Sequence, residues 1–137
     1  MSPYRYTLLL AALALTAAAA DETKAPAAVA KPLLTRPLPD IPGKEAMVLT
    51  VEYPPGGASA PHRHDANTFV YVLEGTVVMQ VEGGKEITFE PGDTFYEFST
   101  DIHSVSRNAS ATEPAKFLVF FVKDQGKPPS APISTTR

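Results

Sequence analysis

The three histidines of this chain are the residues whose type and spacing best suit chemistry. His62 and His64 stand one residue apart in "PHRHD", directly before an apolar stretch. In an extended segment, residues i and i+2 project from the same side, so both imidazoles can reach one point in space. Neutral imidazole is the commonest protein ligand for first-row transition metals. The alternative is a pair of solvated turn residues, and the spacing alone does not separate the two interpretations.

The third histidine, His103, opens another stretch that predicts a strand. Two strands far apart in sequence can lie side by side in a β-sandwich, so His103 can join His62 and His64. The chain has no cysteine, so a metal would have to be held by nitrogen and oxygen ligands. The hypothesis is therefore a divalent transition metal (Fe, Mn, Ni, Zn or Cu) bound by the three histidines.

The elements that must position these histidines are short strands. Runs rich in Val, Phe, Tyr, Thr and Ile are broken by glycine and proline, and no helical periodicity is present. The predicted strands are 45–53, 68–74, 76–82, 85–90, 94–99, 103–108 and 116–122. Several short strands with turns at this spacing are typical of an all-β sandwich or small barrel.

Some of these strands are apolar on both faces. Alternation places Thr68, Val70 and Val72 on the face of the histidines, and the apolar residues between them on the opposite face. A second sheet can cover one face, and the other needs a partner subunit or the proline-rich leader described next. We expect a homodimer.

The two ends of the chain predict segments outside the folded domain. Residues 1–20 have the layout of a secretory signal peptide cut after Ala20, which predicts a periplasmic or secreted protein. The alternative is an uncleaved anchor, but the apolar run is well short of the roughly 20 residues that span a bilayer. Residues 21–44 are rich in Pro and Ala and predict an extended leader rather than a strand or helix. We expect the domain to cover 45–124 and a flexible tail to cover 125–137.

Composition and charge exclude several classes of partner. The net charge is −3 and the twelve Lys and Arg residues are scattered, so neither nucleic acid nor an anionic membrane is expected as a partner. The sequence has no phosphate-binding glycine loop, no nucleophile elbow and no Ser-His-Asp signature. With all histidines assigned to the metal hypothesis, a catalytic triad would lack its base.

Two stretches of the sequence resemble the motifs of the cupin superfamily. "GGASAPHRHDANTFVYVLEG" is similar to the first motif, with Gly56 five residues before the His-x-His pair and Gly75 at its end. "EPGDTFYEFSTDIHSVSRN" resembles the second motif, with a Gly-Asp turn at 92–93, the third ligand at His103 and an asparagine at Asn108. The resemblance covers about residues 47–122. It implies a small RmlC-like cupin, a double-stranded β-helix or jelly-roll barrel whose histidines hold a metal.

The sequence departs from these motifs in two places. Thr68 stands where the family usually has a glutamate ligand, so the resemblance implies a site of three imidazoles without a carboxylate. The Pro-x-Gly that usually leads into the third ligand is replaced by "FST" at 98–100. The turn before His103 is therefore less constrained by its sequence.

The expected function is that of a metal-binding single-domain cupin. As an enzyme it would act on a small organic substrate, as a dioxygenase with Fe or as an isomerase or lyase with Zn, Mn or Ni. The alternatives are a non-catalytic module that binds a small molecule or metal, and a purely structural domain. We expect the substrate pocket to include Thr68, Val70, Met79 and Phe98. No general base is evident in the sequence.

Overall fold

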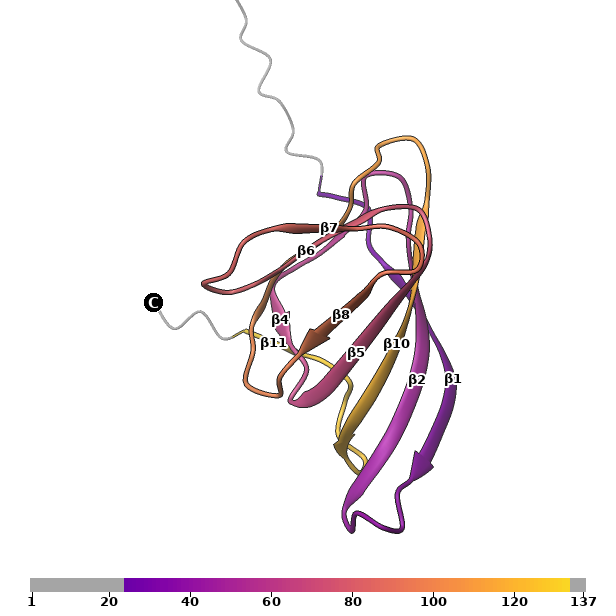
Figure 1. Ribbon diagram of the computed structural model, residues 1–137, viewed down its shortest axis with the longest axis vertical. Helices are drawn as coiled ribbons and strands as arrows, with labels where there is room; N and C mark the ends of the chain where they lie inside the picture. Colours follow the sequence, from indigo (N-terminus) through magenta and orange to yellow (C-terminus); the bar gives the residue numbers. More distant parts are fainter. Residues whose placement is uncertain (1–23, 134–137) are drawn as a thin grey trace, which may run out of the picture.

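The computed structural model describes residues 24–133, so the predicted signal peptide lies outside the described residues. The described part of the chain contains eleven strands and no helix, which confirms the all-β prediction. It therefore offers no helix long and apolar enough to cross a membrane. The strands form two antiparallel sheets that face each other as a double-stranded β-helix (Figure 1).

The first sheet has five strands in the order β1-β2-β10-β5-β8. Their bounds are β1 Val29–Pro37, β2 Lys44–Tyr53, β10 Ala115–Asp124, β5 Ala66–Glu74 and β8 Thr94–Glu97. The second sheet has the order β11-β4-β9-β6-β7, with β3 also paired to β9. Its strands are β11 Ala131–Pro132, β4 His62–Arg63, β9 His103–Asn108, β6 Val77–Val81, β7 Ile87–Phe89 and β3 Ala58–Ser59.

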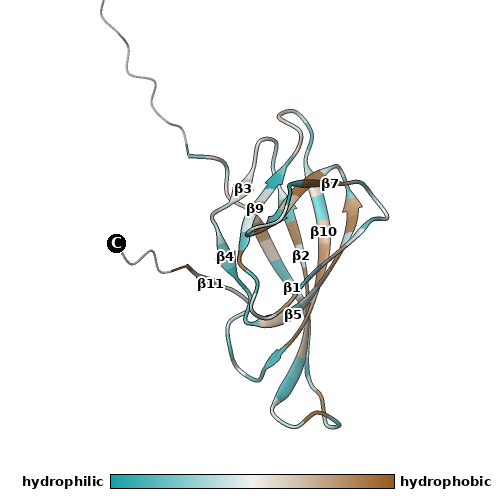
Figure 2. Cartoon of the chain, turned by 60° about the vertical axis from the view of Figure 1, so that its left-hand side comes forward, coloured by the Kyte–Doolittle hydropathy of each residue, from teal (hydrophilic) through white to brown (hydrophobic). Residues whose placement is uncertain are grey.

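The hydrophobic core lies between the two sheets and follows the predicted alternation. On β5, Thr68, Val70 and Val72 are buried, whereas Phe69 and Tyr71 are nearly half exposed. β10 contributes Phe117, Val119 and Phe121 to the same core. In Figure 2 this strand is largely brown, while β4, which carries a histidine, is teal. The strand pattern thus separates an apolar interior from a polar strip where the histidines lie.

The leader differs from its prediction, because residues 29–37 form strand β1. This strand pairs along its whole length with β2, and all of its residues are exposed. Its prolines are tolerated because β1 is an edge strand, and the register shifts between Pro32 and Leu34. The expectation of no strand in this segment is wrong. Since β1 lies beside β2 in the plane of the sheet, it leaves the outer face of β5 uncovered.

The tail also differs from its prediction. Ala131 and Pro132 form β11, which pairs with Arg63 and His62 of β4. The carbonyl of Pro129 accepts a hydrogen bond from a ring nitrogen of His64. Two residues of the predicted tail therefore belong to the second sheet, and a third contacts a histidine, so the folded part of the chain extends beyond the predicted boundary at 124.

Gly75 of the first motif occupies a crowded turn. Its φ is +67°, and a Cβ atom there would lie 2.4 Å from the Pro114 carbonyl oxygen and 2.8 Å from Ala115 Cα. Only glycine meets both demands, because it has no Cβ and adopts positive φ without penalty. This glycine lets β5 turn into β6 against the start of β10.

Candidate metal centre

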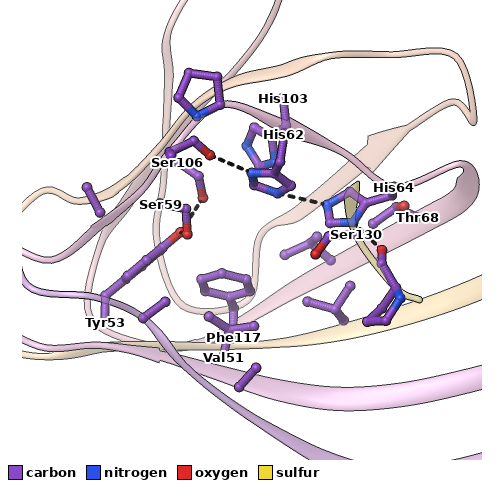
Figure 3. Close-up of a pocket in the computed structure, with 18 of the residues that line it drawn as sticks. Val51, Tyr53, Ser59, His62, His64, Thr68, His103, Ser106, Phe117 and Ser130 are labelled. Atoms are coloured by element: carbon purple, nitrogen blue, oxygen red, sulfur yellow. Dashed lines mark hydrogen bonds between the residues drawn. The ribbon is translucent and has the colours of Figure 1, made fainter. Parts of the chain in front are cut away.

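Strand pairing brings the three histidines together. His62 on β4 and His103 on β9 are direct partners in the antiparallel ladder, although 40 residues separate them in sequence. His64 follows β4 at a bend where Asp65 has a φ of +47°. One ligand atom from each histidine lies within 4.8 Å of those from the other two (Figure 3). The structure therefore places all three predicted ligands around one point.

Backbone carbonyls fix the orientation of two of the imidazoles. Nδ1 of His62 lies 2.8 Å from the Ala60 carbonyl oxygen, and Nδ1 of His64 lies 2.8 Å from that of Pro129. A carbonyl only accepts, so each Nδ1 carries the proton and each Nε2 of a neutral ring carries a lone pair. These two Nε2 atoms face each other at 3.2 Å. Two facing lone pairs repel, so this arrangement fits a shared cation.

The separation of the two Nε2 atoms also suits a metal. Nitrogens that bind one metal at about 2.0–2.1 Å lie about 2.8–3.4 Å apart in octahedral or tetrahedral geometry. The observed 3.2 Å falls within this range. Hydrogen bonds from Nδ1 to carbonyl oxygens are the usual way in which proteins orient metal-binding histidines.

A carboxylate that the sequence analysis did not single out lies beside two of the three histidines. Glu97, at the end of β8, is 2% exposed. Its Oε1 lies 3.1 Å from His103 Nδ1, and its Oε2 lies 3.4 Å from His64 Nε2. Among the described residues, the buried side-chain polar atoms without a hydrogen-bond partner are both carboxylate oxygens of Glu97 and both ring nitrogens of His103. Orphaned donor atoms gathered at one place are what a bound metal ion would satisfy.

Burial sets the protonation of this cluster. Desolvation, together with a smaller effect of the neighbouring histidines, lowers the pKa of His64 to about 4 and that of His103 to about 3. Neutral imidazole is the form that binds a metal. Desolvation, with a smaller contribution from Asp101, raises the pKa of Glu97 to about 7. Without a cation, burial therefore disfavours both the protonated forms of His64 and His103 and the ionised form of Glu97.

A cavity of about 500 Å³ opens beside the histidines between the two sheets. Its walls combine apolar side chains such as Val51, Phe117 and Phe121 with the hydroxyl of Tyr53. The Tyr53 hydroxyl is hydrogen-bonded to Ser59 Oγ and Ser106 Oγ, both at 2.7 Å. The volume suits a small organic molecule held mainly by apolar contacts.

The residues predicted for the substrate pocket divide into two groups. Thr68 and Val70 line the cavity on β5. Met79 is fully buried in the hydrophobic core, and Phe98 is 62% exposed against Tyr96; neither lines the cavity. Phe98 points outward because its neighbour Glu97 occupies the inward position. Of the four residues expected in the substrate pocket, Thr68 and Val70 therefore line this cavity, whereas Met79 and Phe98 do not.

The structure places a carboxylate beside a site for which the sequence analysis expected three imidazoles alone. Glu97 is the direct ladder partner of Thr68 on the neighbouring strand, so the two side chains share one face. The sequence held a signal for it: in "TFYEF", Phe95 and Glu97 alternate onto the inward face, six residues before His103. A glutamate at an inward strand position is unusual enough to suggest a function.

The sequence profile described as "Cupin domain" matches residues 49–121, which contain all three histidines and Glu97. This chain belongs to the cupin family. Among functionally curated proteins, none matches its sequence significantly.

Solved structures share the cupin fold at low identity. A double-stranded β-helix protein from Klebsiella pneumoniae has a TM-score of 0.61 and 17% identity, over 76% of this chain and 82% of that one. A cupin domain from Bordetella pertussis has a TM-score of 0.58 and 20% identity, over 73% of this chain and 97% of that one. The DMSP lyase DddQ from Ruegeria pomeroyi has a TM-score of 0.58 and 22% identity over 67% of this chain, which spans only 45% of that lyase.

Proposed function

We propose that this cupin binds one divalent transition metal through His62, His64 and His103 and uses it to transform a small organic substrate. The observation that carries the proposal is the 3.2 Å approach of the Nε2 atoms of His62 and His64, with the Nδ1 of each ring bonded to a backbone carbonyl. When both rings are neutral, their Nε2 lone pairs face each other. This arrangement is costly without a cation and favourable with one.

The metal would supply Lewis acidity or, if it is iron, redox chemistry with dioxygen. The residues of the chain would do the rest. The carbonyls of Ala60 and Pro129 hold two imidazoles in one tautomer. The apolar walls of the cavity would select an apolar substrate body, and the linked hydroxyls of Tyr53, Ser59 and Ser106 form a polar part of the same wall. An oxygenase acting on an enol or catechol, and a lyase or isomerase, are the reaction classes that fit this chemistry.

The second candidate function is binding without turnover. It is favoured by the scarcity of acid/base groups along the described cavity wall. Beyond the cluster of histidines and Glu97, two titratable groups line it. One is Lys24, which is exposed, and the other is the buried Tyr53, whose hydroxyl is already bonded to two serines. A cavity of this kind could hold a small molecule, or the metal alone, without chemistry.

The deciding experiment is elemental analysis of protein purified without a histidine tag or chelator, beside the His62→Ala/His64→Ala variant. We expect close to one equivalent of Fe, Mn, Ni, Zn or Cu in the wild type and none in the variant. Turnover is then assayed against enols, catechols and DMSP with the metal that is found. The absence of metal from both proteins, even after reconstitution, would refute the metal-dependent enzyme, whereas binding of a small molecule alone would remain. Tight binding without product would favour the second candidate.

The proposal extends to the place where the protein works. We propose cleavage after Ala20 and export to the periplasm or medium. Mass spectrometry of protein isolated from its source would then find a mature chain that begins at Asp21. A chain that retains the first twenty residues would contradict export by cleavage.

A further inference from the structure

Glu97 is the most unusual buried side chain outside the predicted ligand set. It is 2% exposed, and neither carboxylate oxygen has a hydrogen-bond partner. Among the described residues, it forms no ion pair with lysine or arginine; its close polar neighbours are His64 and His103. A buried carboxylate without donors is strongly unfavourable unless a cation lies beside it.

The contacts of Glu97 are those of a ligand rather than of a hydrogen-bond acceptor. Oε1 and His103 Nδ1 are 3.1 Å apart, yet they do not meet the geometry of a hydrogen bond. Oε2 and His64 Nε2 are 3.4 Å apart, and that nitrogen carries a lone pair, since Nδ1 holds the proton. With His103 bound through Nδ1, each distance matches the separation of two atoms bound to one metal, which is about 2.8–3.5 Å for bonds of 2.0–2.2 Å. The group of mutually close ligand atoms contains only the three histidines, so coordination by Glu97 requires a small shift of its carboxylate towards them.

The position of Glu97 explains how a carboxylate can be present although Thr68 has none. The two residues are direct partners in the ladder between β5 and β8, so their side chains lie next to each other on the inner face. Thr68 is short, and its hydroxyl makes only a 3.4 Å contact with the Ala66 carbonyl. The space that a longer side chain would take at position 68 stays open to the carboxylate of the next strand.

We propose that Glu97 is the fourth protein ligand of the metal, so that this cupin carries its carboxylate on β8 instead of β5. This inference rests on the proposed metal site. The site would then combine three neutral imidazoles with one anion. That combination leaves one unit of positive charge on a divalent complex instead of two, and it occupies one coordination position that a three-histidine site leaves open.

The test compares wild type, Glu97→Gln and the matched control Glu74→Gln, a carboxylate at the exposed end of β5. Affinity for Zn²⁺ is measured by competition with a chromophoric chelator, and the ligand set is measured from the visible spectrum of the Co²⁺-loaded protein. For Glu97→Gln we expect at least about tenfold weaker Zn²⁺ binding and a changed Co²⁺ spectrum. The control should match wild type in both measurements.

A second measurement does not depend on how the variant folds. In a crystal structure of the Zn²⁺-loaded wild type, a carboxylate oxygen of Glu97 should lie about 2.0–2.2 Å from the metal. A Glu97 carboxylate that only accepts a hydrogen bond from His103, with the metal on the three histidines, would overturn the inference. So would a Co²⁺ spectrum unaffected by Glu97→Gln. In either case the proposed function would survive, whereas wild type that binds neither metal would refute the proposed function itself.

Discussion

At the scale of single residues, the site is governed by desolvation. The pKa values of His64 and His103 lie far below that of a free imidazole, and the pKa of Glu97 lies above that of a free carboxyl. Each group is thus held towards its neutral form by the same cause. A group whose ionised form is disfavoured by folding weakens the folded state over the pH range in which the unfolded chain would ionise it.

This argument predicts that metal-free Glu97→Gln is more stable than metal-free wild type at pH 8. The pKa of Glu97 rises from 4.5 to about 7, so its penalty begins above pH 4.5 and is complete above about pH 7. Its size is about 3 kcal/mol at pH 8 and less than about 1 kcal/mol at pH 5. Urea unfolding of chelator-treated protein at both pH values measures the difference. Both proteins keep the three histidines, so the difference reports the carboxyl group of Glu97 together with its coupling to His64 and His103.

Glu74→Gln is the control, because this carboxyl group is exposed. It should leave the free energy of unfolding unchanged at both pH values. Equal stability of wild type and Glu97→Gln at pH 8 would contradict the account of Glu97 as a desolvated carboxyl.

At the scale of elements, turns and strand ends decide where the ligands stand. Gly75 allows the close approach of the β5–β6 turn to the start of β10, and the tail places the Pro129 carbonyl against His64. β4 is only two residues long and depends on pairing with β9 and β11. The histidine pair is therefore held by tertiary contacts more than by its own strand.

Gly75→Ala should be severely destabilising, by several kcal/mol. The new Cβ would lie 2.4 Å from a backbone oxygen, which cannot move without disturbing β10, and φ is positive. Gly83→Ala is the matched control: φ there is +80°, but a Cβ would meet nothing within 4 Å. We expect it to cost about 1 kcal/mol. Thermal and urea unfolding compare the two, and similar losses would show that the crowding is unimportant.

A chain that ends at Pro128 should bind metal more weakly. It lacks the Pro129 carbonyl that orients His64 and the β11 strand that pairs with β4. Loss of such a supporting contact typically lowers metal affinity about 10–100-fold. Chelator competition with Zn²⁺ measures the change, and a chain that ends at Ile133 is the control. Full affinity in the shorter chain would show that His64 needs no support from the tail.

The sequence predicted regular elements well and long-range contacts poorly. The strand 103–108 has its predicted bounds, because alternation and flanking turns are local signals. β1 was missed because its prolines argue against a strand, an argument that does not hold at a sheet edge. β11 has two residues and exists only through its pairing with β4. Glu97 was missed although the alternation of the strand 94–99 places it on the inward face with Phe95, because carboxylates are mostly exposed and the pairing with Thr68 that buries it is a long-range contact.

At the scale of the whole molecule, one large apolar surface has no cover within the described chain. The outer face of the five-stranded sheet exposes Phe69, Tyr71, Leu73 and Tyr96 by between 38% and 47%. A cavity of about 390 Å³ on this face is lined by Phe69, Tyr71, Tyr96 and Phe120, among others. Contiguous aromatic surface of this kind marks an interface more often than a free surface.

We therefore retain the prediction of a homodimer through this face. Light scattering after size exclusion should give twice the mass of one chain. Tyr71→Lys should shift the protein to the monomer, because a buried unpaired ammonium in an interface is costly. Ile87→Lys on β7 replaces a similarly exposed apolar residue of the other sheet and should remain dimeric. A wild type that runs as a monomer at high concentration would contradict the prediction.

Both ends of the described chain border the cavity, because its lining includes residues between Lys24 and Ala30 as well as the stretch from Pro129 to Pro132. The strands that carry the ligands cannot gain or lose a residue, because a slip by one reverses which side chains face inward. The tail is constrained as well, since the Pro129 carbonyl must stay beside His64. Residues 24–28 precede β1 and carry no ligand, so this segment can tolerate insertions and deletions. Evolution can therefore reshape this part of the cavity wall by changing the length of one segment while the metal ligands stay in register, so that substrate choice and ligand geometry can diverge independently.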